Sequence, residues 1–401
     1  MGGNKKYSGY KSWSYLEPKV DYFAFKLAKE IGRVEPYVVP VSKTEEERVK
    51  ELLEKSIIID CHDHPVVFPE DLAHIFEYNR QARQVTAYEG LNVSYIDAVF
   101  DNLMNGTALI SSKMGWKWND VIYDLGMRLS DIAHQDFVIR GERVADIKYA
   151  HETGKVALIP TIEALTPIEN EVDRIDVLYG LGFRSMGVVY SESNCLGSGL
   201  REKRDGGLTD FGYECVKRMN KLRVAIDVSH ASDQTALDTI EASSTPIFMS
   251  HTGARSIWDS RRMMPDEVLQ AMAEKGGVIG VESAPHTTIS LKHKEHSIDS
   301  FMDHVVYCVE LIGIDHVGIG PDTLFGDHVG LHKAFTAQLS IKGVHAGVDF
   351  PQVEYVKGLD NPSEVFPNVT RWLVKNGYSD TEIRKIIGEN ALRILTEIWG
   401  G

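Results

Sequence analysis

A series of short apolar segments that alternate with helical patterns is the feature that most limits how this chain can fold. We predict strands at residues 57–60, 105–115, 156–164, 183–190, 223–230, 245–251, 277–282 and 316–322. Helical spacing of apolar residues lies between several of them, as at residues 117–153, 265–275 and 300–312. Apolar strands that alternate with helices indicate a parallel sheet covered on both faces. Eight such units over about 270 residues predict an α/β fold, a (β/α)8 TIM-type barrel.

Composition and charge narrow the class of protein. The chain has 401 residues, of which 43% are hydrophobic, so we expect one large domain over residues 46–401. Residues 1–45 are rich in Tyr, Trp and Lys, and we interpret them as an N-terminal extension that packs on this domain or on a second subunit. The net charge of −15 argues against nucleic acid or an anionic membrane as partner.

The expected location is the cytoplasm. We find no apolar core of a signal peptide and no apolar stretch of about 18 residues, so neither secretion nor a membrane span is expected. The four cysteines form no C-x-x-C pair, and a chain of this size does not need disulfides for stability. Free thiols in a reducing compartment are therefore the prediction.

A possible metal site follows the first predicted strand. Residues 56–65 read SIIIDCHDHP, in which His62 and His64 are two positions apart. Along an extended backbone, such residues point to the same side, so both imidazoles can enter one cavity. Taken alone, the pair is equally compatible with a polar strand end whose histidines are solvated or hydrogen-bonded.

Possible metal ligands also follow four later strands. Glu163 ends the third strand, His230 the fifth, His251 the sixth and Asp322 the eighth. In a parallel barrel the carboxyl ends of all strands lie at one face, where active sites are found. A single buried His or Glu is more often a satisfied core group, but such a cluster is costly to bury unless divalent cations neutralise its carboxylates. We therefore predict a metal centre.

Several segments together resemble the renal or membrane dipeptidases, peptidase family M19 of the amidohydrolase superfamily. The similarity extends over about residues 50–397. It is carried by IDCHDHP, GKVALIPTIEA, FRSMGVVY, AIDVSHAS, PIFMSHTGARSI, SRRMMPDEVL, HVGIGPD and the closing PNVTRWLVKNGYSDTEIRKIIGENALRIL. The resemblance implies a metal-dependent hydrolase that cleaves the amide bond of a dipeptide or a similar small substrate with a free carboxylate.

The resemblance also implies roles for individual residues. His62 and His64 would bind one zinc ion, Glu163 would bridge two, and His230 and His251 would bind the second, giving two Zn²⁺ per chain, with another divalent metal as an alternative. Asp322 would be the acid/base that exchanges a proton with a metal-bridging hydroxide. Arg262 would bind the substrate carboxylate, and Tyr190 would be a second substrate-binding residue.

Two positions depart from the family pattern. The family has His-x-Asp after the first strand, whereas this chain has His62-x-His64, and where the family has a substrate-contacting histidine this chain has Tyr190. Asp63 is a candidate to compensate for the lost carboxylate. Tyr190 can donate a hydrogen bond to a developing oxyanion or simply line the pocket.

These departures leave alternatives open. The same site could act on another amide, a lactam or a lactone, or decarboxylate its substrate, or the chain could be a noncatalytic metal-binding protein. Glu282 and His286 follow the seventh strand and could reach the rim of the site, although His286 is interpreted as an exposed loop residue. His293, His296 and His304 are interpreted as surface residues. From the habit of the family, a homodimer is a further hypothesis.

Overall fold

The computed structural model describes residues 5–102, 117–338 and 353–400, and within them the predicted (β/α)8 barrel is present. Its parallel strands are β1 (Ile59–Val67), β3 (Ala98–Asn102), β5 (Val156–Ile162), β6 (Ser185–Gly187), β7 (Ala225–Asp227), β8 (Phe248–Thr252), β9 (Val278–Val281) and β10 (Val317–Ile319). Three further strands, β2 (Val85–Thr86), β4 (Val138–Arg140) and β11 (Leu324–Phe325), pair with β1 or β5 at the margin.

The strands form two hydrogen-bonded ladders, β1-β3-β5-β6-β7 and β8-β9-β10. Between β7 and β8, Ser250 N donates to Asp227 Oδ1 at 3.1 Å, and His251 N donates to Ser229 Oγ at 3.0 Å. Between β10 and β1, Asp322 N donates to His62 O at 3.0 Å. Side chains and the loop after β10 therefore close the barrel at these two places.

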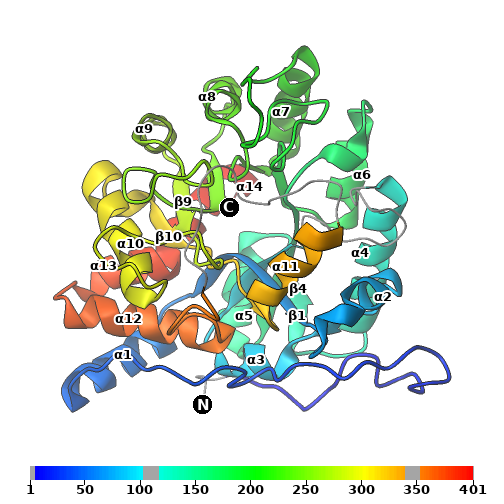
Figure 1. The fold of residues 1–401 in the computed structure, drawn as a ribbon, viewed down its shortest axis with the longest axis vertical. Helices are drawn as coiled ribbons and strands as arrows, with labels where there is room; N and C mark the ends of the chain where they lie inside the picture. The colour runs from blue at the N-terminus through cyan, green and yellow to red at the C-terminus, as the bar shows by residue number, and fades with distance from the viewer. Residues whose placement is uncertain (1–4, 103–116, 339–352, 401) are drawn as a thin grey trace.

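Helices cover the outside of the strands, and Figure 1 shows α6 to α10 following one another around the barrel. The first helix, α1, spans Lys43–Lys55, and Ser42 caps it in a reciprocal arrangement with Glu45. The others are α2 (Ile75–Arg80), α3 (Tyr88–Val93), α4 (Trp118–Ile132), α5 (Val144–Thr153), α6 (Asp173–Leu181), α7 (Asp210–Leu222), α8 (Asp233–Ala242), α9 (Asp266–Glu274), α10 (Ile298–Ile312), α11 (His328–Gln338), α12 (Val365–Lys375), α13 (Asp380–Arg384) and α14 (Asn390–Trp399).

Alternation along the strands separates two large apolar clusters of the core. Val99 and Leu158 belong to the larger cluster, which includes residues of most surrounding helices. Their neighbours Phe100 and Ile159 belong to a second cluster, which joins the beginnings of the strands to one face of α14. The rings of Phe100 and Trp399 lie 6.2 Å apart. The helix α14 thus packs against the amino ends of the strands, and the carboxyl ends remain for the site.

Two sequence expectations differ from the structure. The second strand predicted at residues 105–115 lies outside the described residues, and β3, just before it, is the second strand of the barrel. Residues 117–153, expected to be helical, contain α4 and α5 separated by β4, which pairs with β5. β3 is short and polar at its carboxyl end, and β4 is only three residues long, so neither strand forms a long apolar segment.

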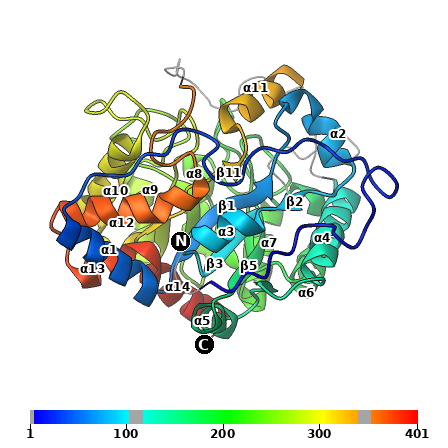
Figure 2. The ribbon, with the colours of Figure 1, turned by 90° about the horizontal axis from the view of Figure 1, so that it is seen from below.

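The N-terminal extension lies against the barrel of its own chain, passing beside α4 and α2 before it returns to α1 (Figure 2). Trp13 is 1% exposed, and its backbone N–H donates to Asp131 of α4 at 2.9 Å. Further along, Val39 N donates to Asn368 Oδ1 of α12 at 3.1 Å. Contacts with its own chain therefore bury part of the extension without a second subunit. The predicted domain boundary at residue 45 stays a prediction.

Two other expectations concern thiols and membranes. All four cysteines are free thiols, and Cys61, Cys215 and Cys308 are buried. Among the described residues, none of the helices has the length and apolar character that a bilayer crossing requires.

Candidate metal centre

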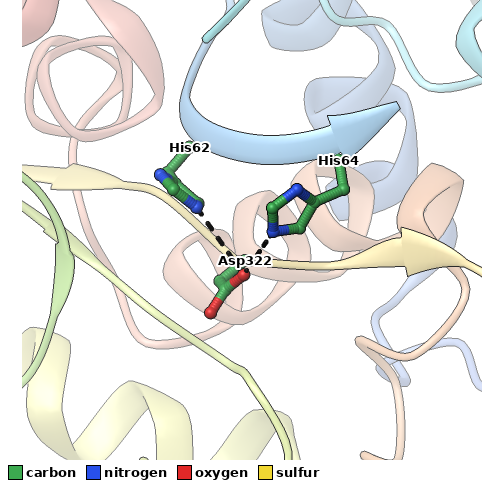
Figure 3. A group of neighbouring side chains, drawn as sticks. All are labelled: His62, His64 and Asp322. Carbon is green, nitrogen blue, oxygen red and sulfur yellow. Dashed lines mark ion pairs between the residues drawn. The ribbon is translucent and has the colours of Figure 1, made fainter. Parts of the chain in front are cut away.

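The two histidines of the first motif lie inside strand β1 rather than after it. The register between β1 and β3 shifts between Asp60 and Asp63, next to His62. The imidazole rings of His62 and His64 are 5.3 Å apart, and both Nε2 atoms approach Asp322 Oδ1, at 3.7 and 3.2 Å (Figure 3). The structure therefore brings this pair into one cavity, as the spacing predicts.

Glu163 connects this pair to the other two histidines. Its Oε1 lies 3.1 Å from His62 Nε2 and 3.8 Å from His251 Nε2. His251 Nε2 in turn lies 3.0 Å from His230 Nε2. All six predicted side chains thus form one continuous group at the carboxyl ends of the strands.

The backbone next to Glu163 requires a glycine. A Cβ on Gly187 of β6 would lie 1.8 Å from Glu163 O, and Leu165 N donates to Gly187 O at 2.9 Å. Because no side chain fits in this space, Gly187 lets β6 approach the end of β5 closely. This contact fixes the backbone from which Glu163 enters the cavity.

Asp322 has an unusual backbone conformation. Its φ of +53° is in the left-handed region, which aspartate tolerates better than most residues. Its N–H donates to His62 O, and its side chain is 14% exposed, more than those of His62 and Glu163. Asp322 can therefore contact both the histidines and a substrate.

A serine hydroxyl beneath the histidines was missed by sequence reasoning. Ser250 Oγ donates to Asp227 and lies 2.7 Å from His251 Nδ1 and 3.3 Å from His62 Nδ1. A hydroxyl has one proton to donate and two lone pairs to accept, so it can receive an Nδ1–H from each ring. Both Nε2 lone pairs are then available for a metal ion. The sequence contains one weak signal for this hydroxyl. Ser250 directly precedes His251, and Asp227 lies two residues before Ser229, near the ends of their strands.

Asp227 holds this arrangement together. It accepts hydrogen bonds from Ser229 N at 2.9 Å, Ser229 Oγ at 2.6 Å and Ser250 N at 3.1 Å, besides that from the Ser250 hydroxyl. All three residues are buried. A carboxylate with four donors around it fixes the hydroxyl proton of Ser250 toward itself, and hence the lone pairs toward the histidines.

The charges of the cluster favour a cation. Burial alone would lower the pKa of His64, but its hydrogen bond with Asp322 and the charges of Asp322, Glu163 and Asp63 raise it to about 9. Burial, with His62 and Arg262 nearby, lowers the pKa of His251 well below its usual value, so His251 stays neutral. The carboxylates thus attract positive charge, while neutral imidazole is available as a ligand.

The donor set fits a divalent metal. Three overlapping groups have ligand atoms within 4.8 Å of one another: His62, His64 and Asp322; His62, Glu163 and His251; His251, Glu282 and Asp322. In the described part of the chain, Glu163 Oε2 is buried without a hydrogen-bond partner. Imidazole nitrogen and carboxylate oxygen are the ligands that Zn²⁺ commonly takes, and a buried carboxylate oxygen without a partner is what a cation would satisfy.

The two predicted substrate-binding residues lie beside this group. The ring of Tyr190 stacks on that of His230 at 4.1 Å. Arg262 is 3% exposed and donates to Ser229 O and His251 O, both at 2.9 Å, and to Glu282. The geometry supports proximity to the cluster for both residues, and their roles stay predictions.

Other acidic and imidazole groups lie differently from their expected positions. Asp63 accepts from Thr323 Oγ1 at 2.9 Å and from the backbone N–H of the candidate ligand His64 at 2.9 Å. His286, His296 and His304 are buried rather than exposed. His296 accepts from His286 N and His304 accepts from Ala254 N, which explains these two buried histidines as structural groups. Their irregular spacing gave no sign of this.

Comparison with known proteins decides the family. The model of the membrane dipeptidases, peptidase family M19, matches residues 46–343 and 337–399. The chain belongs to this family. Membership confirms the predicted family and the predicted class of enzyme, a metallohydrolase.

Individual relatives in this family are distant. Dipeptidase tcpJ of Claviceps purpurea is 25% identical over 277 residues, which are 69% of this chain and 58% of that protein, so the chain spans less than two thirds of it. Among solved structures, an amidohydrolase from Pseudomonas aeruginosa is 26% identical with a TM-score of 0.71, covering 88% of this chain and 99% of the other. A metallo peptidase from Rhodobacter sphaeroides has a TM-score of 0.65 at 19% identity, covering 86% and 100%, and supports the fold.

Proposed function

We propose that this member of family M19 is a metal-dependent hydrolase that cleaves the amide bond of a dipeptide or a similar small substrate. The observation that carries the proposal is the convergence of four imidazoles and two carboxylates at the carboxyl ends of the barrel strands. A purely structural cluster would have its polar atoms paired internally, yet Glu163 Oε2 has no hydrogen-bond partner within the described residues.

The residues would hold two divalent cations, with zinc as the expected metal. His62 and His64 would bind one, His230 and His251 the other, and Glu163 would lie between them. Ser250 would keep the Nε2 atoms of His62 and His251 free for binding. When bound, such cations polarise a carbonyl group and activate a water molecule.

Asp322 would move the proton. Burial favours its protonated form, but the hydrogen bond with His64 and the nearby histidines lower its pKa well below the usual value. The carboxylate is therefore ionised at neutral pH and can accept a proton from the attacking water. The same group can then deliver this proton to the leaving amine.

Tyr190 would stabilise the developing oxyanion. Burial and the charges of Glu163 and Asp322 raise the pKa of the Tyr190 hydroxyl well above its usual value. The phenol therefore keeps its proton and can donate a hydrogen bond, but it cannot act as a cation. Arg262 as the partner of a substrate carboxylate remains a proposal, tested by comparing free dipeptides with their C-terminal amides.

The first experiment is metal content together with turnover of L,L and L,D dipeptides, before and after zinc addition. We expect about two metal ions per chain and cleavage that Asp322→Asn reduces by about 100-fold or more at unchanged metal content. Asp315→Asn is the matched control, because Asp315 lies at the opposite end of β10 and pairs with Lys385 on the surface. A protein that binds no metal, or an Asp322→Asn variant with full activity, would contradict the proposal.

A non-peptide substrate is the second candidate. His64 replaces the usual carboxylate, and Arg262 is already bonded to Glu282. Both features favour a substrate different from a dipeptide, such as another amide, a lactam or a lactone. Metal binding without cleavage of any dipeptide would support this candidate over the first.

A homodimer is also proposed. Val20 and Phe23 of the N-terminal extension are 70% and 68% exposed, and apolar groups of this kind are suited to a contact between subunits. A monomeric mass in solution at micromolar concentration would argue against it.

A further inference from the structure

Glu282 is a buried carboxylate at the wall of the candidate metal centre that the family resemblance does not assign. It follows β9 directly and is 0% exposed. Its carboxylate lies within 4.8 Å of ligand atoms of His251 and Asp322. These three residues come from the ends of β8, β9 and β10, which are neighbours in one ladder.

The backbone holds Glu282 firmly in this place. Glu282 N donates to Thr252 O at 2.9 Å, and Thr288 Oγ1 donates to Glu282 O at 2.9 Å. Its neighbour Ser283 bonds twice to Pro321 O, through N at 2.8 Å and through Oγ at 2.9 Å. The carboxylate therefore enters the cavity from a rigid strand end, as a built ligand would.

The two oxygens of Glu282 have different surroundings. Oε2 accepts from Arg262 Nη2, whereas Oε1 is buried and, within the described part of the chain, has no hydrogen-bond partner. Arg262 also donates to Ser229 O and His251 O, so its guanidinium is fixed beside the cluster. A buried carboxylate oxygen without a donor is costly unless a cation or another donor satisfies it.

We propose that Glu282 is a carboxylate of the metal centre, with Oε1 directed to a divalent cation and Oε2 to Arg262. Four of the six converging groups are imidazoles, which carry no negative charge, so Glu163 and Asp322 alone would offer negative charge to two cations. A guanidinium beside these cations would add to the repulsion. Glu282 accepts from Arg262 and lies within 4.8 Å of a ligand atom of His251, so its negative charge offsets the guanidinium and a cation bound beside His251. This inference rests on the proposed metal-dependent function.

The test measures metal affinity rather than turnover. Metal-free protein is titrated with Co²⁺ and Zn²⁺ in competition with a chromophoric chelator, and the visible spectrum of bound Co²⁺ is recorded. We expect Glu282→Gln to weaken the more weakly bound ion by about tenfold or more and to change the Co²⁺ spectrum. Glu142→Gln should do neither, because Glu142 also pairs with a buried arginine, Arg184, at 2.8 Å but lies outside the site.

A double variant protects the test against misfolding. Arg262→Met with Glu282→Met removes both charges together, which is often tolerated in a protein interior. Weakened metal binding in this variant as well supports the proposal, whereas wild-type affinity and spectrum in either Glu282 variant would overturn it. A wild-type protein that takes up no Co²⁺ or Zn²⁺ would instead refute the proposed function itself.

Discussion

Replacing Ser250 with alanine tests whether one hydroxyl orients two histidines of the proposed metal centre. The hydroxyl donates to Asp227 and lies within 2.7 Å of His251 Nδ1 and 3.3 Å of His62 Nδ1. All three contacts are satisfied together when both rings carry their proton on Nδ1. Ser250→Ala removes the common acceptor, so both rings can rotate or change tautomer.

The size of the effect follows from the burial of the four groups. Ser250 is 3% exposed, His62 2%, His251 0% and Asp227 6%, so water cannot easily replace the hydroxyl. Loss of one supporting group of a metal ligand typically costs about 10- to 100-fold in metal affinity. Because this hydroxyl serves two ligands, we expect about 100-fold, or about 2.7 kcal/mol. The metal-free variant should also lose about 1–3 kcal/mol of unfolding free energy.

Metal competition with a chelator and denaturant unfolding of the metal-free protein measure the two effects separately. Ser185→Ala is the matched control, because Ser185 is 2% exposed and donates a single bond, to Ala225 O at 3.2 Å. It should lose stability but keep its metal affinity. Unchanged metal affinity in Ser250→Ala, or an equal loss in Ser185→Ala, would refute the proposed role of the hydroxyl.

Three further variants test the site and the N-terminal extension. Tyr190→Phe should lower kcat by about 100-fold with little change in metal content if its hydroxyl faces the oxyanion, and a small effect in steady-state kinetics would mean that Tyr190 only lines the pocket. Burial raises the pKa of Glu30 to about 7, against about 4.3 in an unfolded chain, so wild-type stability is lost as pH rises through this window. Glu30→Gln can still accept from Gly90 N. In urea unfolding this variant should therefore be more stable than wild type by about 1–3 kcal/mol at pH 8, but not at pH 4. Equal stability of the two proteins at both pH values would contradict this. Trp13→Ala should lower unfolding free energy by about 3–5 kcal/mol, because the ring is buried against the barrel, and a loss below 1 kcal/mol would mean that the extension docks weakly.

The sequence predicted the strands and ligands that depend on local pattern. Apolar segments such as 156–164 and 245–251 lie at β5 and β8, and the six candidate ligands are adjacent in space because parallel strands end at one face. His62 and His64 are together because alternation along a strand is a local property. Local pattern was therefore enough for the fold class, for most strands of the barrel and for the convergence of its candidate ligands.

Partners brought together by closure of the barrel could not be predicted. The contact of Ser250 with His62 joins residues 188 positions apart, and that of Arg262 with Glu282 depends on how β8 and β9 end. No periodicity along the chain encodes either contact. The second strand was missed for a different reason, since β3 is only five residues long and ends in Asp101 and Asn102.

The places where the barrel closes are also the places where its functional groups lie. Between β7 and β8, side chains of Asp227 and Ser229 replace a backbone ladder, and between β10 and β1 the N–H of Asp322 bonds to His62 O. The groups that orient the candidate ligands therefore also hold the two ladders together. Substitutions there should alter metal affinity and unfolding free energy together. Glu282 lies just after β9 and does not join the two ladders, so Arg262→Met with Glu282→Met, which leaves no buried charge unpaired, should weaken metal binding with less loss of stability. Comparing the two effects across Asp227, Ser250 and Glu282 variants would separate residues that close the barrel from residues that only face the metal.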